Sequence, residues 1–198
     1  FMIGDGGSPD PKAHIFFYRS TDSGRSWKIQ GRLLYQPDLK ADPVGDKRDG
    51  FGEPASIILA DGSVLCVART TDGVGIGPMY AAWSSDLGKT WSRPKAIAPN
   101  GVLPRLLRLE NGVLVLSSGR PGVQLRFSAD GKGRKWTKPY ELVPVTSKDF
   151  NADTCGYTSM LATGPDRFLI VNSHFKHVIG PGQTRKAIMV REVVVRRQ

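Results

Sequence analysis

The sequence has 198 residues, with 23 Gly, 14 Pro, only two Cys and a formal net charge of +10 at pH 7. A chain of this length can bury a substantial core as one domain. Two cysteines without a Cys-x-x-Cys pair exclude a disulfide framework and a cysteine zinc site, and no apolar run approaches the roughly 20 residues that cross a bilayer.

The first elements predicted in chain order are two strands joined by a tight turn. Ile15–Arg19 is apolar and aromatic, Ser20–Trp27 carries the turn, and the chain becomes apolar again at Leu33-Leu34-Tyr35. A polar insertion from Gln36 to Phe51 follows, and we interpret it as a loop at one rim of the fold.

A complete four-stranded antiparallel unit comes next. Its strands are expected at 54–60, 63–69, 79–83 and after Pro94. Asp61-Gly62 is a two-residue hairpin signal between the first two strands, and the third strand runs into a second turn at Ser84–Trp91.

A second unit repeats this order, and a third repeats part of it. The second has strands near 103–109, 113–118 and 123–127, with a hairpin at Asn111-Gly112 and a turn at Ser128–Trp136. The third has strands near 157–163, 168–173 and 186–195. The absence of a long segment with helical periodicity, together with regular turn signals, favours an all-β fold.

Three copies of one turn pattern connect these units. The first two, Ser20–Trp27 and Ser84–Trp91, read Ser-x-Asp-x-Gly-x-x-Trp, and the third, Ser128–Trp136, has one extra residue between Asp and Gly. Ser and Asp side chains bond nearby backbone N–H groups, Gly supplies a positive φ, and Trp is expected to pack the turn against its sheet. Recurrence at such intervals indicates a repeat architecture.

The repeated turn resembles the Asp box of the sialidase (neuraminidase) superfamily. The resemblance implies an all-β propeller of four-stranded antiparallel blades, six when complete, of which about three to four are present here. We expect one partial propeller domain over 1–198, a carboxy-terminal part of a larger ring. Its expected parts are an outer half-blade (1–35), a rim loop (36–52), two blades (53–100 and 101–145) and a partial blade (155–198).

Hairpin geometry gathers five polar residues at one rim. In a two-residue hairpin, the turn fixes which residues face each other, so Glu53 is expected to face Arg69 or Thr70. The same argument sets Arg120 opposite Leu103. All five lie at the strand ends away from their hairpin turns, and the Asp boxes lie at the opposite rim. The five are Glu53, Arg69, Arg120, Tyr157 and His174.

The same residues extend the resemblance to the sialidase active site. In that family Tyr157 would be the nucleophile, since a neutral phenol avoids repulsion by the substrate carboxylate, and sialidases are the Tyr exception among glycosidases. Glu53 would take its proton as general base. Arg69 and Arg120 would bind the substrate carboxylate through charge-assisted hydrogen bonds. Arg105 and His174 are candidate substrate-binding residues in a supporting role.

Less specific interpretations of these residues stay open. Tyr157 could be a rim aromatic, Arg120 a solvated loop residue, and Glu53 with Arg69 a cross-strand ion pair worth about 0.2–1 kcal/mol. A third arginine and an acid/base Asp of the family pattern are not assignable, so this segment alone is not expected to turn over substrate. The alternatives to the hydrolase are a non-catalytic propeller that binds glycan or protein, and a polysaccharide lyase that acts on uronates.

Charge and family resemblance define the expected partners. A positive field suits an anionic ligand, and an acidic glycan or glycoconjugate is the expected one. The basic residues are not interleaved with aromatics as in RNA-binding sheets, so we expect no nucleic acid, and no membrane insertion either. No metal or organic cofactor is expected. The resemblance implies an extracellular or periplasmic location.

Overall fold

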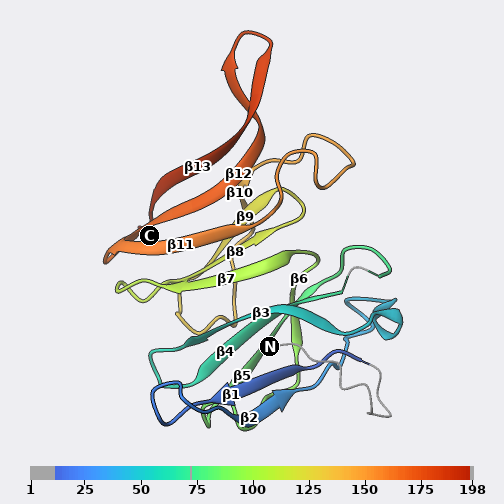
Figure 1. Ribbon diagram of the computed structural model, residues 1–198, viewed down its shortest axis with the longest axis vertical. Helices are drawn as coiled ribbons and strands as arrows, with labels where there is room; N and C mark the ends of the chain where they lie inside the picture. The colour runs from blue at the N-terminus through green and yellow to red at the C-terminus, as the bar shows by residue number, and fades with distance from the viewer. Residues whose placement is uncertain (1–11, 72, 197–198) are drawn as a thin grey trace. The chain divides into compact units, whose positions relative to one another are not determined.

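A computed structural model describes residues 12–71 and 73–196, which form an almost entirely β structure (Figure 1). The expected all-β class with four-stranded antiparallel sheets is confirmed. The chain divides into two compact units, Phe1–Asn100 and Gly101–Gln198. A single domain over the whole chain stays a prediction.

The first unit holds a two-stranded and a four-stranded antiparallel sheet. β1 (Ile15–Arg19) pairs with β2 (Lys28–Leu33), so β2 begins directly after the first turn and five residues before the predicted Leu33. The second sheet has the order β3-β4-β5-β6. Its strands are β3 (Phe51–Ile58), β4 (Val64–Thr70), β5 (Met79–Ser84) and β6 (Lys95–Ala98).

The core of this unit lies where the two sheets meet the start of the rim insertion. Phe51 and Tyr80 are fully buried, and the ring of Tyr35 packs edge-on against Phe51 at a centroid distance of 4.9 Å. Aromatic pairs of this kind add about 0.5–1.5 kcal/mol beyond the area they bury. Cys66 is a buried free thiol in this core, and burial raises its pKa to about 12.

The second unit holds a four-stranded sheet, order β10-β9-β8-β7, and a three-stranded sheet, order β11-β12-β13. Leu109, Val115, Leu125, Phe168 and Ile170 form its buried core. The strands are β7 (Val102–Arg108), β8 (Leu114–Gly119), β9 (Val123–Ser128), β10 (Tyr140–Val143), β11 (Thr158–Gly164), β12 (Arg167–Gly180) and β13 (Gln183–Val194).

The length of β12 corrects the sequence-based boundaries. The predicted strand ended at Ser173, but β12 continues to Gly180 and pairs with β13 as far as Gly180 with Gln183. The apolar pattern stops near Ser173 because the second half of this hairpin leaves the core. Hydrophobic periodicity detects only the half that is buried.

The first two turn motifs form the same set of hydrogen bonds. In the second, Asp86 accepts bonds from the Thr90 backbone N–H at 2.9 Å and the Thr90 hydroxyl at 2.6 Å, and Ser84 Oγ accepts from Gly88 N at 2.8 Å. Gly88 has φ +89°, as the motif requires. Hydrogen bonds from Thr90 lower the pKa of Asp86 to about 2. The sequence-based account of these turns is confirmed.

The tryptophans of the motif differ from one copy to the next. Trp91 stacks on Phe17 at 4.2 Å, as expected of a residue that packs the turn against a sheet. Trp27 is 61% exposed, so that expectation is wrong for the first copy. Its indole still donates to Gly24 O at 3.1 Å.

Candidate active site

Glu53 and Arg69 are the candidate residues of the first unit. Glu53 Oε2 and Arg69 Nη1 are 3.5 Å apart, with 26% and 12% of the side chains exposed. The ladder pairs Gly52, not Glu53, with Arg69, because the register shifts between Gly52 and Ala55. The predicted neighbourhood of Glu53 and Arg69 is therefore right, and their direct cross-strand pairing is wrong by one residue.

The register shift places Glu53 in an unusual backbone conformation. Its φ is +47°, a left-handed value that non-glycine residues rarely adopt. Leu103 has φ +43° at the matching shift of the next sheet, and each of the two precedes a proline. The strained bulge is therefore a feature of the repeat and not of Glu53 alone.

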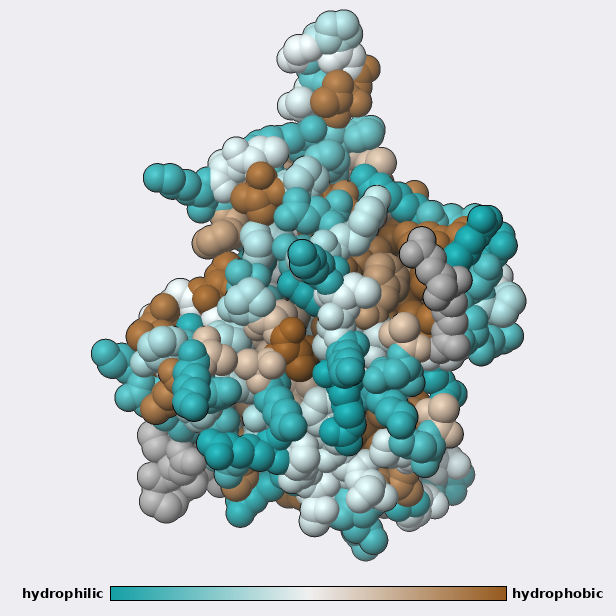
Figure 2. Space-filling model, turned by 180° about the vertical axis from the view of Figure 1, so that it is seen from behind, coloured by the Kyte–Doolittle hydropathy of each residue, from teal (hydrophilic) through white to brown (hydrophobic). Residues whose placement is uncertain are grey.

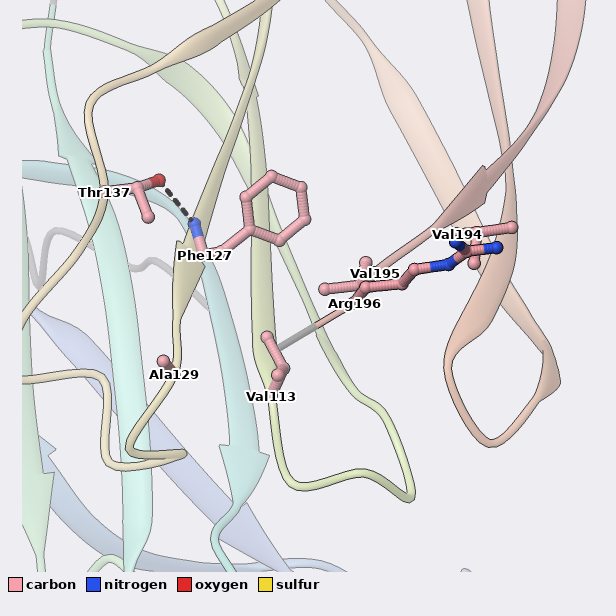
Figure 3. Close-up of a pocket in the computed structure, with 7 residues that line it drawn as sticks. All are labelled: Val113, Phe127, Ala129, Thr137, Val194, Val195 and Arg196. Atoms are coloured by element: carbon pink, nitrogen blue, oxygen red, sulfur yellow. Dashed lines mark hydrogen bonds between the residues drawn. The ribbon is translucent and has the colours of Figure 1, made fainter. Parts of the chain in front are cut away.

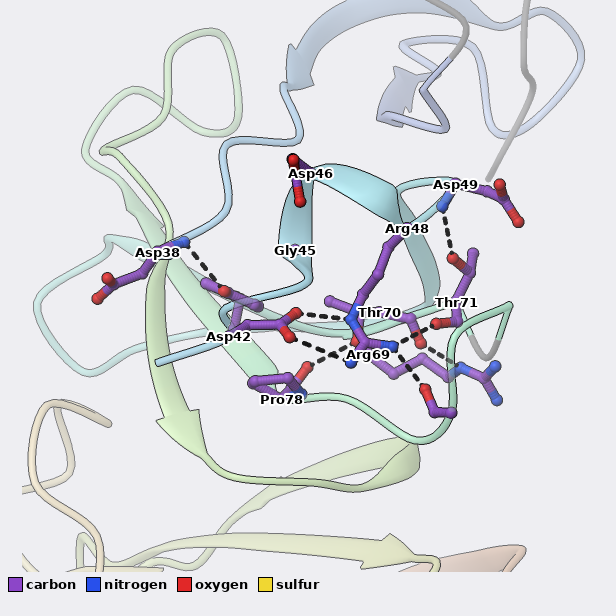
Figure 4. A network of polar contacts seen from close by, with 12 residues as sticks. Asp38, Asp42, Gly45, Asp46, Arg48, Asp49, Arg69, Thr70, Thr71 and Pro78 are labelled. Atoms are coloured by element: carbon purple, nitrogen blue, oxygen red, sulfur yellow. Dashed lines mark hydrogen bonds and ion pairs between the residues drawn. The ribbon is translucent and has the colours of Figure 1, made fainter. Parts of the chain in front are cut away.

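The rim insertion braces the end of β4 that carries Arg69 (Figure 4). Arg48 forms a buried ion pair with Asp42, with Arg48 Nε at 2.6 Å from Asp42 Oδ2 and 4% of each side chain exposed. Arg48 Nη1 also donates to the carbonyls of Thr71 at 3.1 Å and Gly75 at 2.5 Å. The stretch predicted as a polar rim loop is thus an ordered structure with its own buried charge pair.

This network reaches Arg69 through the backbone of its neighbours. Arg69 Nε donates to the carbonyl of Thr70 at 2.9 Å, and Thr70 Oγ1 donates to Pro78 O at 3.2 Å. Gly77 packs so closely on Arg48 that a side chain there would collide with the guanidinium. Sequence reasoning missed Arg48 and Asp42, since charged residues in a polar insertion are usually solvated.

Arg120 and Tyr157 are candidate residues of the second unit. The backbone of Gly119 packs directly on Gly156, so closely that a Cβ on Gly119 would collide with the Gly156 carbonyl. A Cβ on Gly156 would lie 3.4 Å from Cγ of Arg120. This contact brings Arg120 next to the residue that precedes Tyr157, and the Tyr157 side chain is 47% exposed.

The pairing of Arg120 differs from the expectation. β7 and β8 begin their ladder with Val102 opposite Gly119, so Arg120 lies one residue beyond the last pair and does not face Leu103. The cause is the register shift between Val102 and Arg105, which a constant hairpin count does not anticipate. Arg105 itself is exposed in β7 and pairs with Ser117.

A tethered loop fixes the approach to Tyr157. The buried carboxylate of Asp153 accepts bonds from Thr146 N at 2.8 Å and from Lys176 Nζ at 2.9 Å. These bonds hold the pKa of Asp153 at about 2, with the Thr146 hydroxyl contributing most. Cys155 N donates to Ser173 Oγ at 3.0 Å. The sequence carried no motif that would have indicated Asp153.

His174 follows Ser173 on β12, close to the same end of the sheet. The ladder starts with Thr158 opposite Asn172, so Tyr157 is level with Ser173, the neighbour of His174. Burial lowers the pKa of His174, and the positive charges of Arg191 and His177 lower it further. Its buried Nδ1 has no hydrogen-bond partner among residues 12–71 and 73–196. His174 is therefore a neutral imidazole at pH 7.

A pocket of about 540 Å³ lies at the other end of the second unit (Figure 3). It is mainly apolar, and Arg196 is the charged residue in its lining. Thr137 Oγ1 forms a hydrogen bond with Phe127 N at 3.1 Å on its wall. The lining contains neither an acid nor the candidate residues, so chemistry at Tyr157 does not use it. The lining residues are Val113, Phe127, Ala129, Thr137, Val194, Val195 and Arg196.

The described residues offer neither a metal-binding cluster nor a membrane-spanning helix. Over 12–71 and 73–196, no cluster of three or more His, Cys, Asp or Glu could hold a metal ion. In the same ranges, no helix has the length and apolar character to cross a bilayer.

Comparison with known proteins identifies the fold. No protein-family model matches the chain, and no curated protein matches it significantly. Among solved structures, a protein of unknown function from Dyadobacter fermentans superposes with a TM-score of 0.67 at 21% identity, over 93% of this chain and 46% of that one. The α-L-arabinanase of Penicillium chrysogenum gives 0.62 at 17% identity, over 94% and 56%.

Two further structures correspond to the alternatives raised by the sequence. Trypanosoma rangeli sialidase superposes with a TM-score of 0.57 at 14% identity, over 91% of this chain and 27% of that one. An ulvan lyase gives 0.53 at 14% identity, over 88% and 49%. The chain thus spans about half the length, or less, of these structures. At such identities the likeness shows the fold alone, and that fold is part of a β-propeller.

Proposed function

We propose that this chain belongs to a carbohydrate-active propeller that cleaves a terminal acidic sugar in the manner of a sialidase. The observation that supports it best is the contact of Gly119 with Gly156, which brings Arg120 close to Gly156, the residue before the exposed Tyr157. A guanidinium next to a phenol suits a substrate whose carboxylate is attached to the carbon under attack. The glycosidases and the lyase among the structural neighbours support a glycan substrate.

In this proposal the residues divide the reaction between them. Glu53 is assigned as the general base that takes the proton of the Tyr157 hydroxyl, because a protonated phenol is a weak nucleophile. Tyr157 Oη then forms a bond to the anomeric carbon as the bond to the leaving oxygen breaks. Water then attacks the anomeric carbon, and the Tyr157 oxygen leaves and takes back its proton from Glu53. The proton that the water loses to the solvent balances the one that the departed leaving oxygen takes up. Arg69 and Arg120 bind the carboxylate and orient the ring.

Tyr157→Phe in the full-length protein is the direct test. An aryl sialoside is the appropriate substrate, because its phenolate leaves without needing a proton from the enzyme. We expect release of the phenol to fall on the order of a thousandfold or more, since the reaction loses its nucleophile. Unchanged thermal unfolding would show that the fold is intact.

Glu53→Leu is a second test, because the next copy of the repeat has a leucine at the equivalent position. Leu103 occupies the equivalent strained position, so the backbone should accept leucine at position 53. We expect turnover to fall about a hundredfold or more with little loss of stability, because a base is lost and the bulge is kept. Full turnover in either variant would remove the residue from the mechanism.

The second candidate function is the lyase on uronates, and His174 is the observation that favours it. A neutral imidazole near Tyr157 can accept the proton at C5 of a uronate while the phenol protonates the leaving oxygen. A product with ultraviolet absorbance from an unsaturated ring would select the lyase over the hydrolase. Binding without turnover would select the non-catalytic propeller. For any of these activities we propose an extracellular or periplasmic location.

A further inference from the structure

The hairpin of β12 and β13 extends well past the sheet to which it belongs (Figure 1). β11 pairs with β12 only between Arg167 and Asn172, whereas β13 follows β12 out to Gly180. The loop before Tyr157 covers the next few residues, with Phe175 N bonded to Asp153 O at 2.7 Å. Beyond Lys176 the hairpin consists of two strands alone.

Positive charge dominates this hairpin, and its one acidic residue, Glu192, lies near the end of β13 away from the tip. Residues 167–191 contain five Lys or Arg and no Asp or Glu. Three of the five are engaged: Arg167 with Asp166, Lys176 with Asp153, and Arg191 with Asn172. The other two, Arg185 and Lys186, are exposed on the projecting part of β13.

The projecting part presents a mixed surface. His177 pairs directly with Arg185 across the two strands, and Lys186 Nζ lies 4.9 Å from the ring centre of Phe175. Val178 and Ile179 at the tip are 67% and 48% exposed. Hydrophobic and hydrophilic side chains accordingly stand together at the end of the hairpin in Figure 2.

The position of the hairpin connects it to the candidate site. β12 leaves the sheet at Ser173 and His174, which is the end where β11 begins next to Tyr157. Any chain bound at Tyr157 that continues past this end runs along the projecting strands. Clustered positive charge there raises the local concentration of an anionic ligand and speeds its association.

We propose that the β12–β13 hairpin is a binding arm for an anionic polysaccharide, with Arg185 and Lys186 contacting its carboxylate or sulfate groups. The inference rests on the proposed function in that the polymer is taken to be a substrate or its continuation. The cations lie along the strand and face no acidic residue of the hairpin, which suits an extended polyanion. Membrane insertion needs a larger apolar surface than Val178 and Ile179 supply.

Binding of defined polymers to the 198-residue chain tests the proposal. The probes are polygalacturonate for carboxylates, dextran sulfate for sulfate esters and unmodified dextran as the neutral control. We expect binding of at least one anionic polymer, none of dextran, and a loss of about tenfold in affinity between low and high salt because screening weakens exposed charges. The polymer that binds identifies the anionic group.

Arg185→Glu with Lys186→Glu is the decisive variant. It should weaken binding of the anionic polymer by tenfold or more. Arg108→Glu with Lys138→Glu changes the net charge equally at exposed positions elsewhere in the second unit and should weaken it less than threefold. Equal losses in the two double variants would overturn the proposal, because they would indicate a response to net charge alone.

Two further measurements separate this proposal from its competitors. Binding to phosphatidylserine vesicles that is lost in Val178→Ser with Ile179→Ser, without polymer binding, would replace the glycan by a lipid surface. The hairpin variants should also release phenol from a small aryl glycoside at the unmodified rate. If Tyr157→Phe keeps its turnover, the proposed function fails. If the anionic polymer still binds through Arg185 and Lys186 in that case, the hairpin remains a binding arm, but its polymer is no longer taken to be the substrate.

Discussion

The sheets β3–β6 and β7–β10 are two copies of the same four-stranded unit. The differences between them show which features belong to the unit itself and which are specific to the candidate functional residues. Both begin with a bulge whose residue has a positive φ and precedes a proline, Glu53 in one and Leu103 in the other. Both continue through a two-residue hairpin into a turn motif. Backbone strain at Glu53 is therefore not evidence of catalysis, since leucine tolerates the same conformation.

The two sheets carry different residues at the ends of their second strands, β4 and β8. Arg69 pairs with Gly52 in the first sheet, and Gly119 takes its place opposite Val102 in the second. The second sheet instead carries a guanidinium one residue later, at Arg120. The exchange has a steric reason, because only glycine allows β8 to approach Gly156 so closely. The position of the candidate arginine therefore depends on the segment that each sheet packs against.

The largest expected effect concerns the rim insertion that precedes the first sheet. Arg48→Met leaves Asp42 as a buried charge without its partner. Removing one member of such a pair costs about 3–5 kcal/mol, and we expect this loss in the free energy of unfolding measured with urea. Turnover should fall as well, because the insertion holds the end of β4 that carries Arg69.

The double variant Asp42→Leu with Arg48→Met sharpens this prediction. Apolar replacement of a whole buried pair is often close to neutral, so the double variant should be more stable than Arg48→Met. If both variants unfold at the wild-type denaturant concentration, the ion pair contributes nothing and the insertion is held by other contacts, such as Tyr35 Oη with Gly45 O at 2.7 Å.

Gly119→Ala should have the next largest effect. The new methyl group collides with the backbone of Gly156, and backbone cannot rotate away as a side chain can. We expect a loss of about 1–3 kcal/mol in unfolding free energy. Arg69→Ala at the equivalent position removes a long, partly exposed ion pair and one hydrogen bond to the Thr70 carbonyl without any backbone collision, and it should cost about 1 kcal/mol. An equal cost at both positions would contradict the steric account.

The contrast between these residues shows how far sequence reasoning reaches. The turn motifs and hairpin signals located the strands and both sheets, because they depend on local backbone chemistry. The facing partners predicted for Glu53 and Arg120 were wrong, since a two-residue hairpin count misses both the offset at the hairpin loops and the later bulges. Asp153 and Arg48 were missed because their partners, Lys176 and Asp42, are selected by tertiary packing.

Asp86→Ala tests the turn motif through its dependence on pH. Hydrogen bonds from Thr90 lower the folded-state pKa of Asp86 from 3.8 to about 2. The stabilisation is therefore complete above about pH 4 and disappears as the pH falls toward 2. The variant should be less stable than wild type at neutral pH, and the two should converge in acid. Glycan binding should hardly change, because the motif follows the end of β5 opposite to Met79, the residue that pairs with Arg69. Lost affinity without lost stability would contradict this placement.

The smallest expected effect on stability concerns the tryptophans of the second and third turn motifs, Trp91 and Trp136. Trp91 Nε1 donates to Gly88 O at 3.1 Å, whereas the buried Nε1 of Trp136 has no hydrogen-bond partner among the described residues. The extra residue of the third motif accounts for the difference, because it changes the path of the turn and moves the carbonyl away. Both Trp→Phe variants lose ring area, but only Trp91→Phe also loses a hydrogen bond, so it should cost about 1 kcal/mol more in chemical unfolding. If Trp136→Phe costs as much, its indole finds a partner in solution and the third turn is closed like the other two.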